Sequence, residues 1–397
     1  MIWLIIVILI VLIITIITIL ICNKMTSYKY LNYNSTYLKG GKFNPSDVAY
    51  AESLDLKLKE NQIKAYISQY VNAPENAKII FNSGATESIA NLIFWAKEYN
   101  RYGKIQGSIL DHPSVKENAK NYGVGYTQYS YNDLNKDQIE IDDGTSMLFI
   151  SGVGPSTGEI YPMNKFKKYV YMSQYEDDEP NQNMRQYPFI KVLDASQMIG
   201  KIPIDMVNNE LNAVFFSLHK IGGEFNTGIL IIDDSNIYTK FKPIIAGTQQ
   251  NHLRGGTYNT YAYLDLPNLL QKYESKYNPE KCKKQFNKII KELKKHNINY
   301  HKPQLPTLNN TVLIHLNECN AGIINNLSEY GIYLGSSTAC ETNNINTDLR
   351  ISYLTGDELN DKTIKFICDE IDDIDNVDVD NVDVDNIDVD NIDNDDD

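Results

Sequence analysis

Two side chains of opposite charge follow two strand-like runs in the middle of the chain. Lys220 ends the run NAVFFSLHK, directly before a glycine pair, and Asp194 ends the earlier run FIKVLD. An amine of this kind can form a Schiff base with a carbonyl compound, and a carboxylate can keep a ring nitrogen protonated. In a parallel sheet, groups at the carboxyl ends of the strands meet where ligands bind. The pair therefore predicts a site for pyridoxal 5′-phosphate, which needs both groups.

A glycine turn would supply the anion-binding part of such a site. SGATES, residues 83–88, follows the strand-like run IIF and opens an amphipathic helical pattern. Gly84 permits a tight turn, and the N–H groups at the start of a helix, with the Thr86 hydroxyl, can hold a phosphate. Many strand-to-helix turns look like this one. Taken singly, Lys220 reads equally well as a solvated loop charge and Asp194 as a helix N-cap.

Strand-like and helical runs alternate through the body of the chain. Strands are predicted at AKIIF, SMLFISGV, FIKVLDA, NAVFFSL and GILIID, and helices at TESIANLIFWAKEY and PEKCKKQFNKIIKELKKH. Strands separated by helical crossovers form a mostly parallel sheet that is covered on both faces. The predicted fold class is therefore α/β, with a smaller α+β domain at the C-terminal end.

Six motifs in order give these residues a family resemblance. SGATES, DHPSV, DASQMIGKIPIDM, SLHK, LRGGT and SSTAC resemble the cysteine desulfurases, the NifS-like branch of the class V aminotransferases, and the resemblance runs from about Tyr30 to Leu354. It implies a fold type I pyridoxal-phosphate enzyme that works as a homodimer. It also implies conversion of L-cysteine to alanine, with the sulfur carried as a persulfide on an enzyme cysteine and passed to an acceptor protein.

The resemblance also assigns roles to individual residues. Lys220 would be the Schiff-base lysine, Cys340 the sulfur acceptor, and His112 would stack on the cofactor ring and move protons. Asp194 would pair with the ring nitrogen and Gln197 would approach the ring oxygen. The phosphate would be held by Ala85, Thr86, Ser217 and His219, with Thr257 reaching the phosphate of the neighbouring subunit. Arg350 and Asn34 would bind the substrate, and the planar guanidinium of Arg350 suits a carboxylate.

The sequence departs from the family in two places that bear on activity. VGPSTGEI has Gly154 and Pro155 where the family carries a pair of asparagines, one of which bonds the ring oxygen. Only nine residues separate Cys340 from Arg350, which is a shorter tether than the family commonly has. The cofactor could therefore bind normally while sulfur transfer is impaired or restricted to one partner.

Composition excludes some classes of partner. The formal charge is −14, but 13 acidic residues and no basic ones lie from Asp372 to the end, which leaves 37 basic against 38 acidic residues in the body. Such a balance gives no basic surplus for binding nucleic acid. Five scattered cysteines without a CxxC pair predict neither a zinc site nor a disulfide framework, and no metal site is expected. The acidic repeats of residues 372–397 are typical of a disordered tail.

The N-terminal run predicts an attachment to a lipid bilayer. Residues 2–22 are apolar apart from Thr15 and Thr18, and about 20 such residues can cross a bilayer as a helix. Basic residues follow the run, so the positive-inside tendency places the body on the cytoplasmic side. The expected organisation is an anchor (1–23), a large cofactor domain (24–258), a small domain (259–371) and a tail (372–397).

Two other functions fit the same fold. One is a lyase or aminotransferase that acts on a different amino acid, which retention of Cys340 and Arg350 disfavours. The other is a catalytically impaired, membrane-tethered scaffold, which Gly154, Pro155 and the short Cys340 loop favour. Intact Lys220 opposes the scaffold, since a protein without catalysis has no need of it.

Overall fold

The computed structural model describes residues 42–315 except 48, 101, 109, 131–132, 135–138, 168, 173–188, 236 and 238–239, together with 328, 334–335 and 363–367. Contacts divide the chain into two compact units, the first ending at Lys59 and the second beginning at Glu60. Helix α2 (Ala51–Tyr70) spans this division. All of the described strands lie in the second unit.

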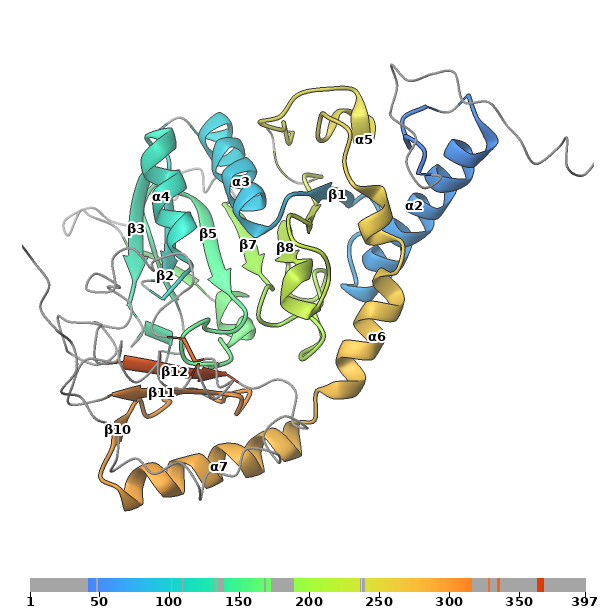
Figure 1. Cartoon of the computed structure of the whole chain (residues 1–397). Coiled ribbons are helices and arrows are strands. Elements are labelled where there is room, and N and C mark those ends of the chain that lie inside the picture. Colours follow the sequence, from blue (N-terminus) through green and yellow to red (C-terminus); the bar gives the residue numbers. More distant parts are fainter. Residues whose placement is uncertain are drawn as a thin grey trace, which may run out of the picture. The chain divides into compact units, whose positions relative to one another are not determined.

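A seven-stranded sheet forms the centre of the second unit (Figure 1). Its order is β1 (Lys78–Asn82), β9 (Gly228–Ile232), β8 (Ala213–Ser217), β7 (Ile190–Asp194), β5 (Thr145–Ser151), β2 (Lys104–Ser108) and β3 (Gly125–Tyr129). Strand β9 runs antiparallel to both of its neighbours, and the other pairings seen between neighbours are parallel. Six of the seven strands therefore point the same way, which confirms the prediction of a mostly parallel sheet.

Apolar side chains cover both faces of this sheet. All five residues of β8 and of β9 are buried, as are all seven of β5, because alternate side chains enter opposite cores. On one face, Phe149 and Phe215 pack in a cluster with helices α3 (Ala85–Tyr99) and α4 (Pro113–Tyr122). On the other, Ile150 and Phe216 pack with residues of α2 and of α6 (Leu266–Lys276).

The C-terminal part of the described chain has a different construction. Helix α7 (Pro279–Lys295) leads into an antiparallel sheet of β10 (Asn299–Tyr300), β11 (Thr311–His315) and β12 (Thr363–Ile367). A helix and an antiparallel sheet agree with the predicted α+β character of this part, while the expected domain boundaries stay a prediction.

The described residues also form several shorter elements. These are the parallel pair β4 (Ile139–Asp142) and β6 (Tyr169–Met172), the turn-like helices η2 (Met163–Lys167), η3 (Leu218–Ile221) and η4 (Thr260–Tyr263), and α5 (Gln249–His252).

Both ends of the chain fall outside the described residues. The expected anchor at 2–22 and the acidic tail at 372–397 are among the parts not described. Within the described ranges, no helix combines the length and the apolar character that a membrane span requires. The membrane attachment therefore stays a prediction.

Candidate active site

The polar residues picked out in the sequence gather at one edge of the central sheet. Asp194 ends β7 and lies opposite Phe215 of β8, and Ser217 ends β8 opposite Gly228. Gly228 is also opposite Asn82, the last residue of β1. Because β9 is antiparallel, its first residue joins the last residues of its neighbours at the same edge. The expectation that these residues lie at strand ends is confirmed.

The turn between β1 and α3 is bound tightly to the end of β8. The backbone N–H of Ala85 donates to Ser217 Oγ over 2.8 Å, and Gly84 N donates to Asn82 Oδ1 over 3.0 Å. Gly84 has φ 135°, a conformation that favours glycine, and a Cβ there would lie 3.2 Å from Ser217 Oγ. A hydroxyl has one hydrogen and two acceptor sites. Ser217 therefore accepts from Ala85, and its hydroxyl hydrogen is not used in that bond.

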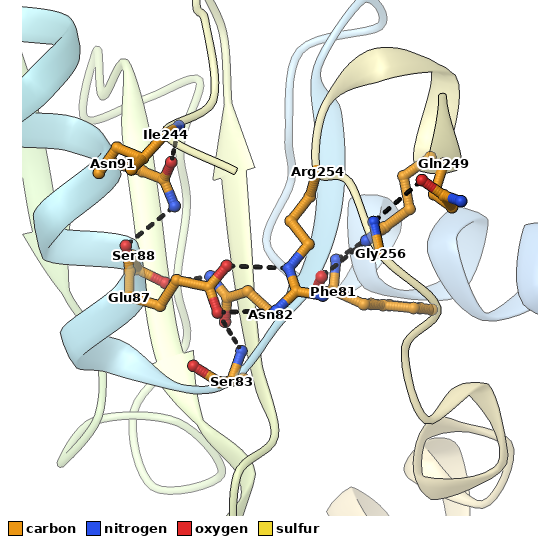
Figure 2. A network of polar contacts seen from close by, with 12 residues as sticks. Phe81, Asn82, Ser83, Glu87, Ser88, Asn91, Ile244, Gln249, Arg254 and Gly256 are labelled. Carbon is orange, nitrogen blue, oxygen red and sulfur yellow. Dashed lines mark hydrogen bonds and ion pairs between the residues drawn. The ribbon is translucent and has the colours of Figure 1, made fainter. Parts of the chain in front are cut away.

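An ion pair next to this turn was not found from the sequence. Arg254 Nε lies 3.0 Å from Glu87 Oε1 and Arg254 Nη2 lies 3.2 Å from Oε2, so the pair is bidentate (Figure 2). Glu87 Oε2 also accepts from Ser83 N at 2.8 Å. Burial by itself raises the pKa of Glu87, but the hydrogen bonds from Arg254 and Ser83 and the charge of Arg254 outweigh burial and hold this pKa below its ordinary value. The Glu87 carboxylate, next to the turn of residues 83–85 that is predicted to bind phosphate, is thus ionised, and Arg254 balances its charge.

The segment that carries Arg254 has a strained backbone. Gln250, Asn251 and His252 have φ values of 49°, 57° and 65°, the left-handed region that side chains other than glycine seldom adopt. The Gln250 side chain accepts from Phe81 N at 2.8 Å and donates to Phe81 O at 2.7 Å, as a neighbouring strand would. These bonds and the Glu87 ion pair hold the segment in place. Thr257 follows it and is exposed.

Asp194 and Lys220 lie near enough to interact electrostatically. Asp194 Oδ1 accepts from Ser196 N at 2.9 Å. Burial raises the pKa of Asp194 above its ordinary value, and the Ser196 hydrogen bonds and the positive charge of Lys220 oppose this rise without cancelling it. Lys220 itself is exposed in η3, which begins directly after Ser217. The charge of Lys220 is thus felt at the carboxyl group of Asp194, while the cofactor roles of both residues stay a prediction.

Glycines shape the turn after Lys220. Gly222 ends η3 in the left-handed conformation with φ 85°. A Cβ on Gly223 would lie 2.7 Å from the Leu218 Cβ, closer than real contacts come. His219, the other predicted phosphate ligand in this turn, stacks on Phe225 with ring centroids 5.7 Å apart. Burial, and then the charge of Lys220, lower the pKa of His219. This imidazole is therefore neutral near pH 7.

His112 is held by its own helix and by the residue before it. It caps α4, and its Nδ1 accepts from Ser114 N at 3.2 Å and lies 2.7 Å from Ser114 Oγ. When the ring is neutral, it therefore carries its hydrogen on Nε2. The preceding residue, Asp111, is buried and accepts from Ser108 N and from Ser151 Oγ, each at 2.7 Å. These bonds tie the His112 turn to the ends of β2 and β5. Asp111 was missed, although DHPSV contains it.

The stretch that departs from the family is closely packed. A Cβ on Gly154 would lie 2.7 Å from Thr157 Oγ1 and 3.3 Å from the Tyr161 ring. An asparagine at position 154 would therefore need its neighbours to move. The neighbouring side chains therefore pack around a glycine at position 154. The difference from the family affects this packing as well as removing one amide side chain.

The remaining predicted residues divide into two groups. Gln197 is half-buried in the turn after Asp194, and Thr86 is exposed in the first turn of α3. Asn34, Cys340 and Arg350 lie outside the described residues, so their positions stay predictions.

The described residues fit pyridoxal phosphate. The N-terminus of the 15-residue helix α3, flanked by the Ser217 hydroxyl, suits a phosphate. The Lys220 amine suits an aldehyde, and the neighbouring Asp194 suits a protonated ring nitrogen. No group of three or more His, Cys, Asp or Glu side chains that could hold a metal is found among the described residues.

A comparison with protein families places the chain. The family described as "Aminotransferase class-V" matches residues 29–355, which is more than half of the sequence. The chain belongs to the class-V aminotransferases. Pyridoxal 5′-phosphate is the cofactor of this family, so the predicted cofactor is confirmed at the level of the family.

Individual relatives place the chain in the NifS-like branch of the class-V aminotransferases. It is 22% identical over 234 residues to "Cysteine desulfurase NifS" of Azotobacter vinelandii, covering 56% of this chain and 54% of that protein. It is 29% identical over 206 residues to "Cysteine desulfurase IscS" of Plasmodium falciparum, covering 48% and 34%. The X-ray structure of a NifS-like protein from Rickettsia africae aligns with TM-score 0.65 and 22% identity over 84% of this chain and 89% of that one. The predicted NifS-like, fold type I architecture is confirmed.

The matched regions are shorter than the relatives themselves. The chain spans about half or less of the length of the curated relatives named above. Its substrate, reaction and partners are therefore matters for proposal.

Proposed function

We propose that this class-V aminotransferase is a cysteine desulfurase. It would convert L-cysteine to L-alanine, with Cys340 as the sulfur acceptor. The observation that carries the proposal is the placement of Asp194 at the end of β7 and of Lys220 just beyond the end of the neighbouring β8, to which the start of α3 is bonded. The similarity to proteins named cysteine desulfurase supports the choice of substrate.

Each described residue has a task in this proposal. Lys220 would hold the cofactor aldehyde and, once displaced by substrate, move a proton at the substrate α-carbon. Asp194 would hold the ring nitrogen, while Ala85, Thr86, Ser217 and His219 would bind the phosphate. His112 would lie against the ring, and Gln197 would approach the ring oxygen. When bound, the cofactor withdraws electrons from the substrate α-carbon.

The sulfur step would be carried by residues outside the described ranges. Arg350 and Asn34 would bind the substrate, with the Arg350 guanidinium on its carboxylate. The Cys340 thiolate would attack the substrate sulfur, so that an S–S bond forms while the bond from that sulfur to the β-carbon breaks. The β-carbon takes up a proton, and the products are alanine and a Cys340 persulfide. The persulfide would then pass its sulfur to an acceptor protein.

The setting of the reaction is part of the same proposal. The enzyme would be a homodimer, with Thr257 of each copy reaching the phosphate of its partner. The apolar run at 2–22 supports attachment to a bilayer, and the basic residues after it support a body on the cytoplasmic side.

The cofactor and the reaction can be tested separately on the purified full chain. Wild-type protein should absorb visible light as a Schiff base, and Lys220→Ala should lose this band. Sulfide should be released from L-cysteine with a thiol reductant, and Cys340→Ser should abolish release while keeping the band. A colourless protein that stays folded would contradict the proposal. Colour without sulfide would contradict the desulfurase and favour a lyase or aminotransferase.

The tight packing at Gly154 favours a second candidate, a catalytically impaired scaffold. A scaffold would bind a partner protein equally well with Lys220→Ala and would release neither sulfide nor any other amino-acid product. Retention of a Lys220-dependent band together with turnover of an amino acid would exclude it.

A further inference from the structure

Helix α7 carries a concentrated positive charge that sets it apart from the rest of the chain. Its 17 residues include seven lysines and two glutamates, a net charge of +5. At about 100° per residue, the seven lysines fall within an arc of about 160°. The five apolar residues, including buried Cys282 and Leu293, fall on the opposite side.

The lysines of this face are solvated. Lys283, Lys284, Lys288, Lys291 and Lys294 are all exposed. Within the described ranges no ion pair joins any of these five to a carboxylate, whereas Lys295 pairs with Glu292 at 3.2 Å. Like charges at this spacing repel each other and weaken a helix. A mobile negative partner would remove that repulsion.

The chain supplies such a partner close by. Residues 372–397 contain 13 aspartates and no basic residue, and they begin five positions after Ile367, the end of β12. Strand β12 belongs to the same three-stranded sheet as β10, which α7 contacts and leads into (Figure 1). The root-mean-square end-to-end distance of a 26-residue random coil is about 30 Å, and a 17-residue helix is about 25 Å long. The acidic segment can therefore reach the whole face at a high effective concentration.

We propose that the basic face of α7 is the docking surface for this chain's own acidic segment, residues 372–397. The contact is electrostatic, and its Asp–Lys pairs are interchangeable, because the regularly spaced aspartates can pair with the lysines in more than one register. Docking neutralises the face and withholds it from anionic partners. It is independent of the proposed catalytic function, since neither element carries a predicted site residue.

The rate at which individual lysines are acetylated tests this docking. Full chain, a variant with all 13 tail aspartates changed Asp→Asn, and a variant ending at residue 371 are treated briefly with an N-hydroxysuccinimide acetate and read by peptide mass spectrometry. Lysines beside carboxylates keep their protons longer, and half a pKa unit slows the reaction about threefold. We expect the five α7 lysines to react about threefold more slowly in the full chain than in both variants. Lys116 and Lys120 of α4 should react equally in all three.

Salt and a matched substitution separate docking from other causes. Raising salt from about 0.05 M to 0.5 M should remove the protection, because charges are then screened within about 5 Å. The salt concentration needed to elute the full chain from immobilised heparin, a polyanion, should increase when the tail is neutralised. That increase should vanish with Lys283, Lys284, Lys288 and Lys291→Gln, but not with Lys116, Lys120, Lys242 and Lys272→Gln.

Two results would overturn the proposal. Equal reactivity of the α7 lysines with and without the tail would show that the tail does not dock there. Protection that arises only when phosphatidylserine vesicles are added, with or without the tail, would assign the face to a lipid surface instead.

Discussion

The turn before α3 and the turn after β8 lie at the same edge of the sheet, yet they are built in opposite ways. In the first turn, three successive backbone N–H groups already donate to side chains. Ser83 donates to Glu87, Gly84 to Asn82 and Ala85 to Ser217. In the second, His219 and Lys220 are exposed beyond a short 3₁₀ turn. The first turn is thus fixed by its own hydrogen bonds, while the second leaves an exposed amine that can react.

Replacement of the amine should have the largest effect. Lys220→Arg keeps the positive charge but cannot form a Schiff base, so the visible band should disappear. Loss of proton transfer at the substrate should lower kcat by about 10²–10⁴-fold. Absorbance and single-turnover kinetics measure the two effects. A variant that keeps both colour and turnover would show that Lys220 is an ordinary solvated loop charge.

A side chain that crowds the turn between β1 and α3 should lower the stability of the fold. A Cβ on Gly228 would lie 2.4 Å from Gly84 Cα, a backbone atom that cannot rotate away. Gly228→Ala should therefore lower the free energy of unfolding by about 1–3 kcal/mol, measured in urea. Gly123→Ala is the control, because Gly123 has φ 64° but a Cβ there would meet no atom within 4 Å. Strain alone should cost that variant about 1 kcal/mol. Equal losses would show that the turn is less rigid than its contacts indicate.

The Glu87–Arg254 ion pair should affect phosphate binding through its charges, so that a loss of affinity in one variant is recovered in the double variant. Arg254→Gln leaves an uncompensated carboxylate beside the phosphate turn, which should weaken phosphate binding by on the order of 1 kcal/mol, or about fivefold. Glu87→Gln/Arg254→Gln removes both charges and should recover most of that loss. Titration of pyridoxal phosphate into a Lys220→Ala background measures the non-covalent affinity. If the double variant is instead weaker than either single one, the pair serves only to hold the segment in place.

The smallest effect should be on the dependence of stability on pH. A carboxyl group whose pKa is higher in the folded than in the unfolded protein binds its proton more tightly when folded. Its contribution to stability is therefore present at low pH and falls as pH rises from about 4 through the raised pKa of Asp194. Asp194→Asn should remove this decline, so the cofactor-free variant should be at least as stable as wild type at pH 7. Thermal unfolding of both proteins from pH 4 to 7 measures this, and a less stable variant would contradict it.

Sequence patterns predicted the elements of this site better than its internal contacts. The apolar runs of β5, β7, β8 and β9 and the helical spacing of α3 are local properties, and the structure has these elements where they were expected. That β9 runs against its neighbours could not be predicted, because a buried strand has the same composition in either direction.

Contacts between distant parts of the chain were the ones missed. Glu87 and Arg254 are 167 positions apart, and neither residue type signals its partner. Asp111 looked like part of a loop motif, and only the structure shows that Ser151 bonds to it. Motif order predicts roles for Lys220, Asp194 and His112, because the family pattern already contains long-range information that composition lacks.

The position of Gln250 has a consequence for the behaviour of the protein in a crowded solution. Strand β1 is the outermost strand of its sheet, and an uncovered border of this kind offers backbone groups to any passing polypeptide. By occupying the Phe81 N–H and C=O, one glutamine side chain fills the place that a foreign strand would take. We therefore expect the unusual backbone of residues 250–252 to reduce aggregation through this strand, in addition to carrying Arg254 to Glu87.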